Sequence, residues 1–510
     1  MAPRRTAVIR PALSAAVIVA VLLVELPARL HAPGQQMEEG FMILLPYRVV
    51  HGATIYRDFH YFWGPGGLWL PALVQSVFGW TIGVERAVGS FYLAVWALGA
   101  WWIARRWSEV AGLAAGMIII ATVPTVDQPI YGALALEMLA VIAAARALEI
   151  EGPHAARWSV VAGLLAGTAV LFRPEQIIGL TLALGVLTWG RRPRQWWTFV
   201  GAAIPLAIFG ACAVDAGVGH AFSNIVVAGA HVPAERRLAF PPPGLAAPLL
   251  LGLVVGGVAI VTVVGVRRLL RSPRDVQGRL LTAVGLLSLC LLGEVFQRLE
   301  VGQMKADFIA IGFLPVAALD LARDTRLPRL GVATAGVVVL ALAFSAATWR
   351  SLLRPYGANV QVTLGLRSEG TTTVSNRGRS FVYVTATAEL VEQTIARVEE
   401  VSRPGQRLFV GPADLRRTPY DDNSIAVLLP ELTDSMSFPD MHPRVALDDM
   451  AELVADVRRA DVVVLSSAYA NWNEPNESRR YGSDAANQVV AALFCSRGQY
   501  GPYEVLVRCH

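Results

Sequence analysis

The chain has 510 residues, of which 54% are hydrophobic and only 16% are charged. Soluble domains carry about 25% charged residues, so this composition excludes a wholly soluble protein. The formal net charge of +5 is explained by the positive-inside bias of membrane proteins, because the residues after 350 show no basic patch. A nucleic-acid partner is therefore not expected.

Residues 1–350 predict a polytopic α-helical membrane domain, because apolar runs of roughly 18–22 residues recur along them, each long enough to span a bilayer. The first run follows Arg4, Arg5 and Arg10 and is interpreted as an uncleaved helix rather than a signal peptide. About 11 transmembrane helices are expected, at residues 11–28, 84–104, 108–124, 130–149, 158–173, 176–190, 197–216, 245–266, 280–297, 306–322 and 330–349.

The arginines between these spans predict the orientation. With the N-terminus in the cytoplasm, every inner segment is rich in arginine, whereas the longer outer segments hold about half as many. An odd number of spans then places residues 351–510 outside the cytoplasm, at the outer face of the cell membrane. The chain is thus expected to be a multi-pass membrane protein with an extracytoplasmic C-terminal domain.

The first outer loop, residues 29–83, contains two apolar stretches that we do not count as spans. Counting residues 66–80 would invert every later loop and place the arginine clusters outside. We therefore expect a helix lying in the membrane interface there, with Trp69 and Trp80 at headgroup depth, and a similar helix at residues 37–50.

Residues 351–510 have an ordinary soluble composition and predict a small α/β domain. Strands are expected at 381–385, 407–410, 461–465 and 503–507, and helices at 389–401, 447–459 and 485–494, which favours a mostly parallel sheet. Cys495 and Cys509 are expected to form a disulfide if this domain lies outside the cytoplasm. Cys212 and Cys290 lie in apolar spans and are interpreted as packing residues.

Ionisable residues gather at the outer ends of the expected spans and in the first outer loop. Charged groups near hydrocarbon are costly and usually mark a site, so we expect one outward-facing cavity to collect them. Such a cavity could hold a phosphate on arginine or lysine and activate an acceptor hydroxyl with a carboxylate. The residues concerned are Glu38, Glu39, Arg57, Asp58, His60, Asp127, Glu137, Arg173, Glu175, Glu294, Lys305 and Asp307.

The membrane domain resembles the GT-C superfamily of integral-membrane glycosyltransferases, such as protein O-mannosyltransferases and lipid A aminoarabinose transferases, and within it the actinobacterial type. The shared pattern is an acidic pair after the first span, a Tyr-Arg-Asp-Phe element, an aromatic and Gly-Pro turn, and a Phe-Gly before a span containing arginine. In this chain these are Glu38-Glu39-Gly40, Tyr56–Phe59, Tyr61–Gly67, Phe78-Gly79 and Arg86.

The resemblance implies roles for individual residues. Glu38 stands at the place of the family's catalytic base, with Glu39 as the alternative, and Asp127 or Glu137 is the second acid. Arg57, Arg173 and Lys305 would bind the donor phosphate, and Asp58, His60 and Asp307 would support the site. An architectural role for the Arg57–Asp58 pair stays open. Lys305-Ala306-Asp307 matches a family element, although Ala310 replaces its histidine.

The predicted function is transfer of a sugar from a polyprenyl-phosphate donor to an acceptor hydroxyl at the outer face of the cytoplasmic membrane. The acceptor could be a glycan, a lipid or a protein. No cofactor is expected, and a divalent metal is possible but not indicated by any ligand cluster. Two alternatives remain: a transporter or flippase of lipid-linked precursors, and an inactive scaffold with the GT-C fold.

Overall fold

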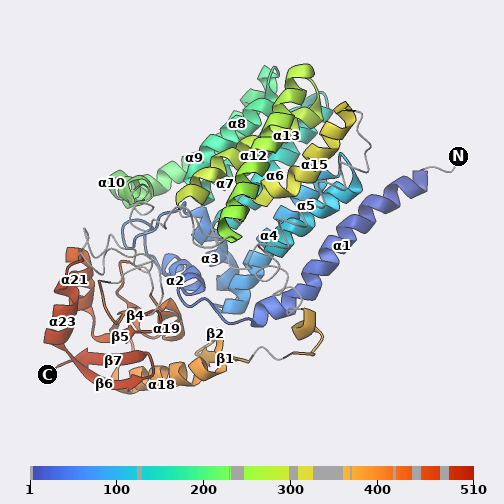
Figure 1. The fold of residues 1–510 in the computed structure, drawn as a ribbon. Helices are drawn as coiled ribbons and strands as arrows, with labels where there is room; N and C mark the ends of the chain where they lie inside the picture. Colours follow the sequence, from blue (N-terminus) through green and yellow to red (C-terminus); the bar gives the residue numbers. More distant parts are fainter. Residues whose placement is uncertain are drawn as a thin grey trace. The chain divides into compact units, whose positions relative to one another are not determined.

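The structure is a computed structural model that describes residues 4–122, 129–228, 230, 246–297, 308–325, 360–367, 370–416, 421–438, 450–470 and 482–509 (Figure 1). The chain divides into two compact units. The first, called here the helical unit, comprises Met1–Ala28, Gly89–Gly210 and Leu238–Arg367. The second, called the mixed unit, comprises Arg29–Val88, Ala211–Arg237 and Ser368–His510. The first outer loop and the C-terminal residues thus belong to one compact body.

Seven of the described helices are long and apolar enough to cross a membrane. They are α1 (Arg4–His31), α4 (Ile82–Ala104), α6 (Pro129–Glu149), α7 (Pro153–Phe172), α9 (Arg192–Ala216), α12 (Ala246–Arg271) and α13 (Val276–Gln297). Shorter apolar helices are α5 (Glu109–Thr122), α8 (Ile177–Thr188) after the turn η1 (Pro174–Gln176), and α15 (Phe308–Thr325). Each expected span except 330–349, which lies outside the described residues, therefore coincides with a helix, and the count of eleven stays a prediction.

Small residues let the helices of the helical unit approach closely, as is usual in membranes. A Cβ atom on Gly163 of α7 would lie 1.9 Å from the carbonyl oxygen of Thr198 in α9, and one on Gly201 would lie 2.2 Å from that of Val160. Glycine is therefore required at both crossings. Helices α6, α7, α8, α12 and α13 pack beside one another in the same way (Figure 1).

The mixed unit contains the two helices expected in the first outer loop, α2 (Glu38–Val50) and α3 (Gly66–Phe78). Each has 13 residues, about 20 Å of helix, which is too short to cross a bilayer core of about 30 Å. Leu73, Val77 and Phe78 of α3 are exposed. The placement of these helices in the membrane interface stays a prediction. The unit also includes α10 (Val218–Phe222) and the π-helical turn η2 (Ser223–Ala228).

The C-terminal residues form two sheets rather than one. The strands β3 (Arg407–Pro412), β4 (Thr433–Asp434), β5 (Val462–Ser466), β6 (Phe494–Tyr500) and β7 (Tyr503–Arg508) pair in the order β4-β3-β5-β7-β6. Strand β3 runs parallel to β4 and β5, whereas β7 runs antiparallel to β5 and β6. The prediction of a mostly parallel sheet is wrong, because β6 and β7 form a hairpin that the sequence pattern did not reveal. The expected strand at 381–385 also leaves this sheet: β2 (Arg379–Val384) pairs with β1 (Thr371–Asn376).

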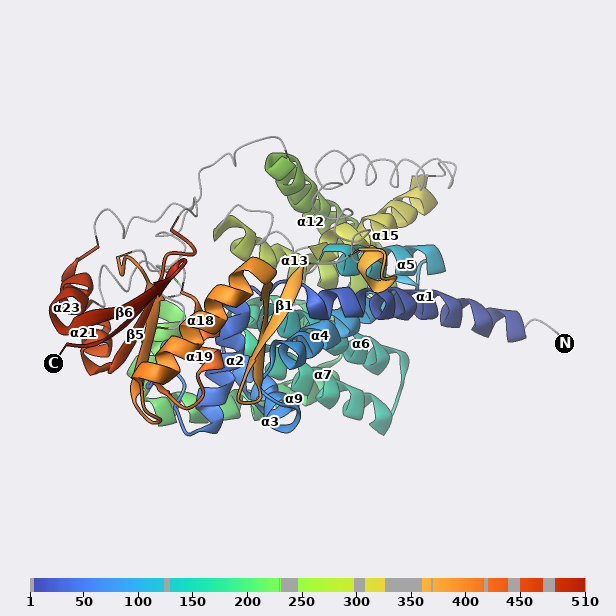
Figure 2. The same ribbon diagram turned by 90° about the horizontal axis from the view of Figure 1, so that it is seen from below.

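The predicted disulfide is confirmed, and it joins Cys495 at the start of β6 to Cys509 just after β7, with their Cα atoms 5.2 Å apart. Cys212 and Cys290 are free thiols. The helices are α18 (Thr385–Val401), α19 (Asn423–Leu428), α21 (Met450–Arg459) and α23 (Ala485–Leu493). Helix α18 packs along β6 and β7, and α21 packs beside α23 (Figure 2).

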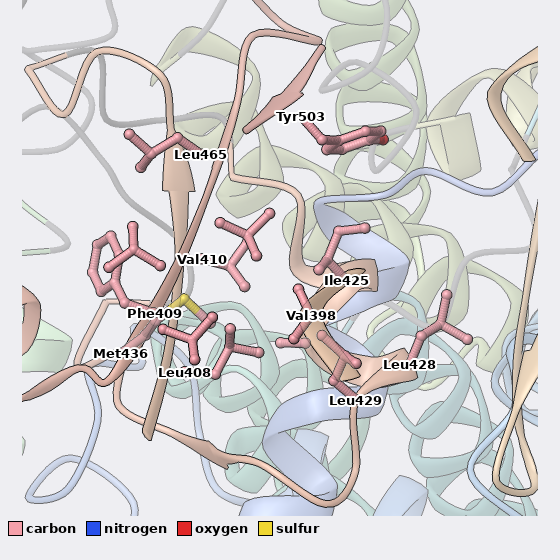
Figure 3. Packing of buried hydrophobic residues seen from close by; sticks show 14 of the residues in the cluster. Val398, Leu408, Phe409, Val410, Ile425, Leu428, Leu429, Met436, Leu465 and Tyr503 are labelled. Carbon is pink, nitrogen blue, oxygen red and sulfur yellow. The ribbon is translucent and has the colours of Figure 1, made fainter. Parts of the chain in front are cut away.

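One apolar core joins the sheet, its helices and the first outer loop. Phe409, Val410 and Leu465 come from the strands and Ile425 from α19, and they pack together in Figure 3. Ile43 and Leu44 of α2 belong to the same cluster. A second cluster packs the opposite part of α2 against the rest of the first loop and α10. Because α2 is buried on both sides, the backbone that carries Glu38 and Glu39 is held within the mixed unit.

Candidate active site

The acidic pair that begins α2 consists of two carboxylates with different surroundings. Glu39 is 1% exposed and Arg86, in α4, is 3% exposed. Arg86 Nε donates to Glu39 Oε1 at 2.6 Å and Arg86 Nη2 donates to Glu39 Oε2 at 3.0 Å, which makes a bidentate ion pair. The backbone N–H of Gln35 donates to Glu39 Oε2 at 2.6 Å. Glu39 is therefore fully engaged inside the unit.

Arg86 also terminates α1. Its Nη1 donates to the carbonyl oxygens of Arg29, Leu30 and Ala32 at 3.1, 3.0 and 2.6 Å, and its Nη2 donates to that of Pro33 at 3.2 Å. The last carbonyls of a helix have no partner within the helix, and a cation there also interacts favourably with the helix dipole. The ion pair thus fixes the turn between α1 and α2.

These contacts separate the two candidates for the base. Glu39 interacts with Arg86 and a backbone N–H, so it has a structural role. Glu38, one residue earlier, is only partly buried. Successive residues of a helix point about 100° apart, so the same buried turn directs its two glutamates to different surroundings. Of the acidic pair, Glu38 is the carboxylate that remains a candidate for chemistry.

The Arg57–Asp58 pair lies at an exposed turn of the first loop. Arg57 Nε donates to Asp58 Oδ1 at 3.1 Å, and Arg57 Nη2 donates to Thr54 Oγ1 at 2.6 Å. The backbone N–H of Thr54 donates to Asp58 Oδ2 at 2.7 Å. The hydrogen bond from Arg57 lowers the pKa of Asp58 below its usual value. This geometry matches the architectural alternative, in which the pair closes the turn.

His60 faces the C-terminal part of the mixed unit. Its Nε2 lies 3.3 Å from Glu452 Oε2 in α21, and its ring stacks on Phe438 with centroids 4.2 Å apart. Its backbone N–H donates to the carbonyl oxygen of Ser437 at 2.8 Å. The loop is also tied down by Arg48, which donates to Asp434, to Met436 and to the carbonyl oxygen of Asp58. His60 and Arg48 thus join the first loop to the sheet.

Tyr56, within the Tyr-Arg-Asp-Phe element, has a left-handed backbone with φ of 71°. Left-handed backbone is strained in a bulky residue and persists only where the surroundings impose it. The Tyr56 side chain is 1% exposed, and its hydroxyl donates to the carbonyl oxygen of Trp63 at 2.7 Å. Asn224 of η2, which the sequence analysis did not single out, accepts from the N–H of Tyr61 at 2.9 Å. The motif therefore serves to set the path of the loop.

The helical unit assembles a separate group of charges. Arg173, just after α7, donates to Glu175 and, through Nη2, to Glu294 Oε2 of α13 at 3.0 Å. Glu137 of α6 is fully buried, and within the described part of the chain neither of its carboxyl oxygens has a hydrogen-bond partner. It interacts electrostatically with Arg173, Glu175 and Glu294. The expected second acid and the expected phosphate ligand thus lie in one cluster, whereas Asp127, Lys305 and Asp307 lie outside the described residues.

A second acidic pair, Asp421 and Asp422, lies just before α19 and was not predicted from the sequence. Both side chains are completely buried. Asp422 accepts from Tyr503 Oη at 2.8 Å and from Ser424 Oγ, whereas no side-chain oxygen of Asp421 has a partner among the described residues. Burial raises the pKa of Asp421 well above its usual value. Adjacent aspartates in a stretch that otherwise resembles a loop were the only available signal.

A metal site is not formed by the described residues, since no group of three or more histidine, cysteine, aspartate or glutamate side chains converges there.

Neither a known protein-family model nor a curated protein sequence matches the chain. Solved structures do resemble it. ArnT from Cupriavidus metallidurans bound to undecaprenyl phosphate has a TM-score of 0.54 at 15% identity, covering 96% of this chain and 97% of that one. The same protein in the apo state has a TM-score of 0.49 at 14% identity, covering 96% of this chain and 97% of that one. An Archaeoglobus fulgidus oligosaccharyltransferase in complex with Zn and sulfate has a TM-score of 0.46 at 11% identity, covering 96% of this chain and 72% of that one.

The fold likeness rests on the first of these structures, which matches over nearly the whole length of both chains. Together with the seven apolar helices, it identifies a multi-pass membrane protein with a small C-terminal sheet domain. The actinobacterial type stays a prediction. The chain therefore has a fold like that of ArnT, whereas its membership of the GT-C superfamily stays a prediction from the motifs of its first outer loop.

Proposed function

We propose that this protein is a glycosyltransferase that moves a sugar from a polyprenyl-phosphate donor to an acceptor hydroxyl at the outer face of the cytoplasmic membrane. The GT-C fold supports the reaction class, and the undecaprenyl phosphate held by ArnT supports the donor class. The proposal depends on the different surroundings of Glu38 and Glu39 at the start of α2. The buried Glu39–Arg86 pair holds the turn and leaves Glu38 as the partly exposed carboxylate at the family's base position.

In the proposed reaction Glu38 accepts the proton of the acceptor hydroxyl. The hydroxyl oxygen attacks the anomeric carbon and forms the new glycosidic bond with inversion. The bond between that carbon and the phosphate oxygen breaks, and its electron pair leaves with the polyprenyl phosphate. General-base catalysis of this kind typically contributes about 10²–10⁴-fold to the rate.

The leaving phosphate needs cations, and we propose Arg173 and Lys305 as its ligands, with Arg57 as a further contact. Arg173 is held by Glu294, whose side chain is 16% exposed, and by Glu175, whose side chain is 49% exposed. A phosphate can replace the exposed Glu175 while Glu294 keeps the guanidinium in place. Planar guanidinium groups bind phosphate oxygens in the bidentate manner that this requires.

The test uses purified full-length protein and a polyprenyl-phosphate carrier loaded with sugar. Release of free polyprenyl phosphate in the presence of acceptor is measured for wild type, Glu38→Gln and the control Glu389→Gln, which changes an exposed glutamate of α18. We expect Glu38→Gln to lose at least about 10²-fold in rate and the control to keep wild-type activity. Wild-type release by Glu38→Gln would refute the mechanism, and movement of the donor across vesicles without release would favour a transporter.

A further inference from the structure

The turn that carries Glu38 is held against the C-terminal part of the mixed unit. A Cβ atom on Gly40 of α2 would lie 2.8 Å from the backbone nitrogen of Ser424 and 2.9 Å from Asn423 Cβ. The backbone of α2 therefore touches that of α19, and only glycine allows this approach. Asn423 Nδ2 donates to the carbonyl oxygen of Met37 at 3.4 Å. The residue before Glu38 is thus bonded to a segment almost 400 positions later in the sequence.

A second contact reaches the same turn from the residues after β5. The hydroxyl of Tyr469 donates to Gln36 Oε1 at 3.1 Å. Tyr469 also interacts electrostatically with Glu38 and Asp422. Burial raises the pKa of Tyr469, so its hydroxyl keeps its proton and remains a donor. Tyr469 therefore contacts the loop two residues before Glu38, in the electrostatic field of the proposed base.

Hydrogen bonds tie the segment behind these contacts to both sheets. Asp422 accepts hydrogen bonds from Tyr503 of β7 and from Ser424, and Ser424 Oγ in turn accepts from Tyr383 Oη of β2 at 2.7 Å. All four side chains are buried. Buried side chains that bond to one another in this way restrict the arrangement of the backbone that carries them. The anchor for the loop is therefore connected to both sheets.

We propose that Tyr469 is a positioning residue for Glu38 and that the C-terminal sheet domain thereby sets the orientation of the proposed base; this inference rests on the proposed function. Glu38 is flanked by Met37, bonded to Asn423, and by Glu39, bonded to Arg86. Gln36, bonded to Tyr469, restrains the chain before this turn. The partly exposed Glu38 thus lies on a backbone that is restrained on both sides. A catalytic group held in this way needs little reorganisation to reach reactive geometry.

The test compares Tyr469→Phe with Tyr500→Phe in the full-length protein. Both remove one hydroxyl and keep the ring, but the described residues provide no hydrogen-bond partner for the Tyr500 hydroxyl. We expect Tyr469→Phe to lower kcat by about three- to tenfold, the effect of one hydrogen bond, with KM for the donor unchanged. Tyr500→Phe should keep both constants. If Tyr469→Phe has wild-type kcat, or raises KM alone, the proposal fails.

Hydrogen exchange provides a readout that does not depend on activity. In Tyr469→Phe the amides of residues 35–41 should exchange faster than in wild type, and in Tyr500→Phe they should not. Unchanged exchange, or an equal increase in both variants, overturns the positioning role. Wild-type transfer by Glu38→Gln would instead refute the proposed function, so the two failures are distinguishable.

Discussion

Replacing Glu39 by glutamine tests whether Glu39 has a structural role, distinct from the role in catalysis proposed for Glu38. The variant removes the counter-charge of Arg86, which is 3% exposed and donates to Glu39 through two nitrogens. Breaking one partner of a buried ion pair typically costs about 3–5 kcal/mol, because the other charge stays buried without compensation. The new amide would also direct N–H groups at Arg86 or at the N–H of Gln35. We therefore expect a loss of stability of about 3–5 kcal/mol.

The matched control is Glu38→Gln, the same substitution at the preceding residue. Glu38→Gln alters a carboxylate that is only partly buried, so its removal should cost less stability than that of the fully buried Glu39. Thermal unfolding in detergent should show a decrease in Tm of about 3–5 °C for Glu39→Gln and a smaller decrease for Glu38→Gln. Transfer activity should show the larger loss in Glu38→Gln. Equal melting temperatures for the two variants would refute the structural assignment of Glu39.

Three further predictions concern the C-terminal domain. Replacing Cys495 and Cys509 together by serine should lower the free energy of unfolding by about 3 kcal/mol, since the disulfide closes a short loop. In the wild-type protein on intact cells, both thiols should react with a membrane-impermeant maleimide after reduction. Protection of both thiols would contradict the extracytoplasmic orientation. Asp421 has a raised pKa, so the folded state holds a proton that the unfolded state releases above pH about 4. Its contribution to stability therefore falls as pH rises, by up to about 1.4 kcal/mol per pH unit, and Asp421→Asn should flatten the dependence of Tm on pH; an unchanged slope would contradict this.

The membrane architecture was predictable because it depends on local properties. An apolar run long enough to span a bilayer must satisfy its backbone as a helix, whatever surrounds it. The expected spans accordingly coincide with helices throughout the described residues. The disulfide was predictable for a similar reason, since two cysteines in a domain that is expected to lie outside the cytoplasm have few other partners.

The sheet order was less predictable because pairing joins distant segments. The expected strand at 381–385 is correct as a strand, but it pairs with β1 instead of joining the main sheet. The hairpin of β6 and β7 makes that sheet mixed. Residues 494–500, Phe-Cys-Ser-Arg-Gly-Gln-Tyr, have little apolar alternation, because β6 is largely exposed at the edge of the sheet.

The sequence alone determined that two adjacent glutamates follow the first span in a GT-C-like loop. Tertiary structure decided which of them is buried, because Arg86 lies 47 positions away from Glu39. It also brought Asn423 and Tyr469 to the turn that precedes α2. Composition and periodicity indicate which side chains must be buried or paired. Packing between segments far apart in the chain determines which residues those side chains contact.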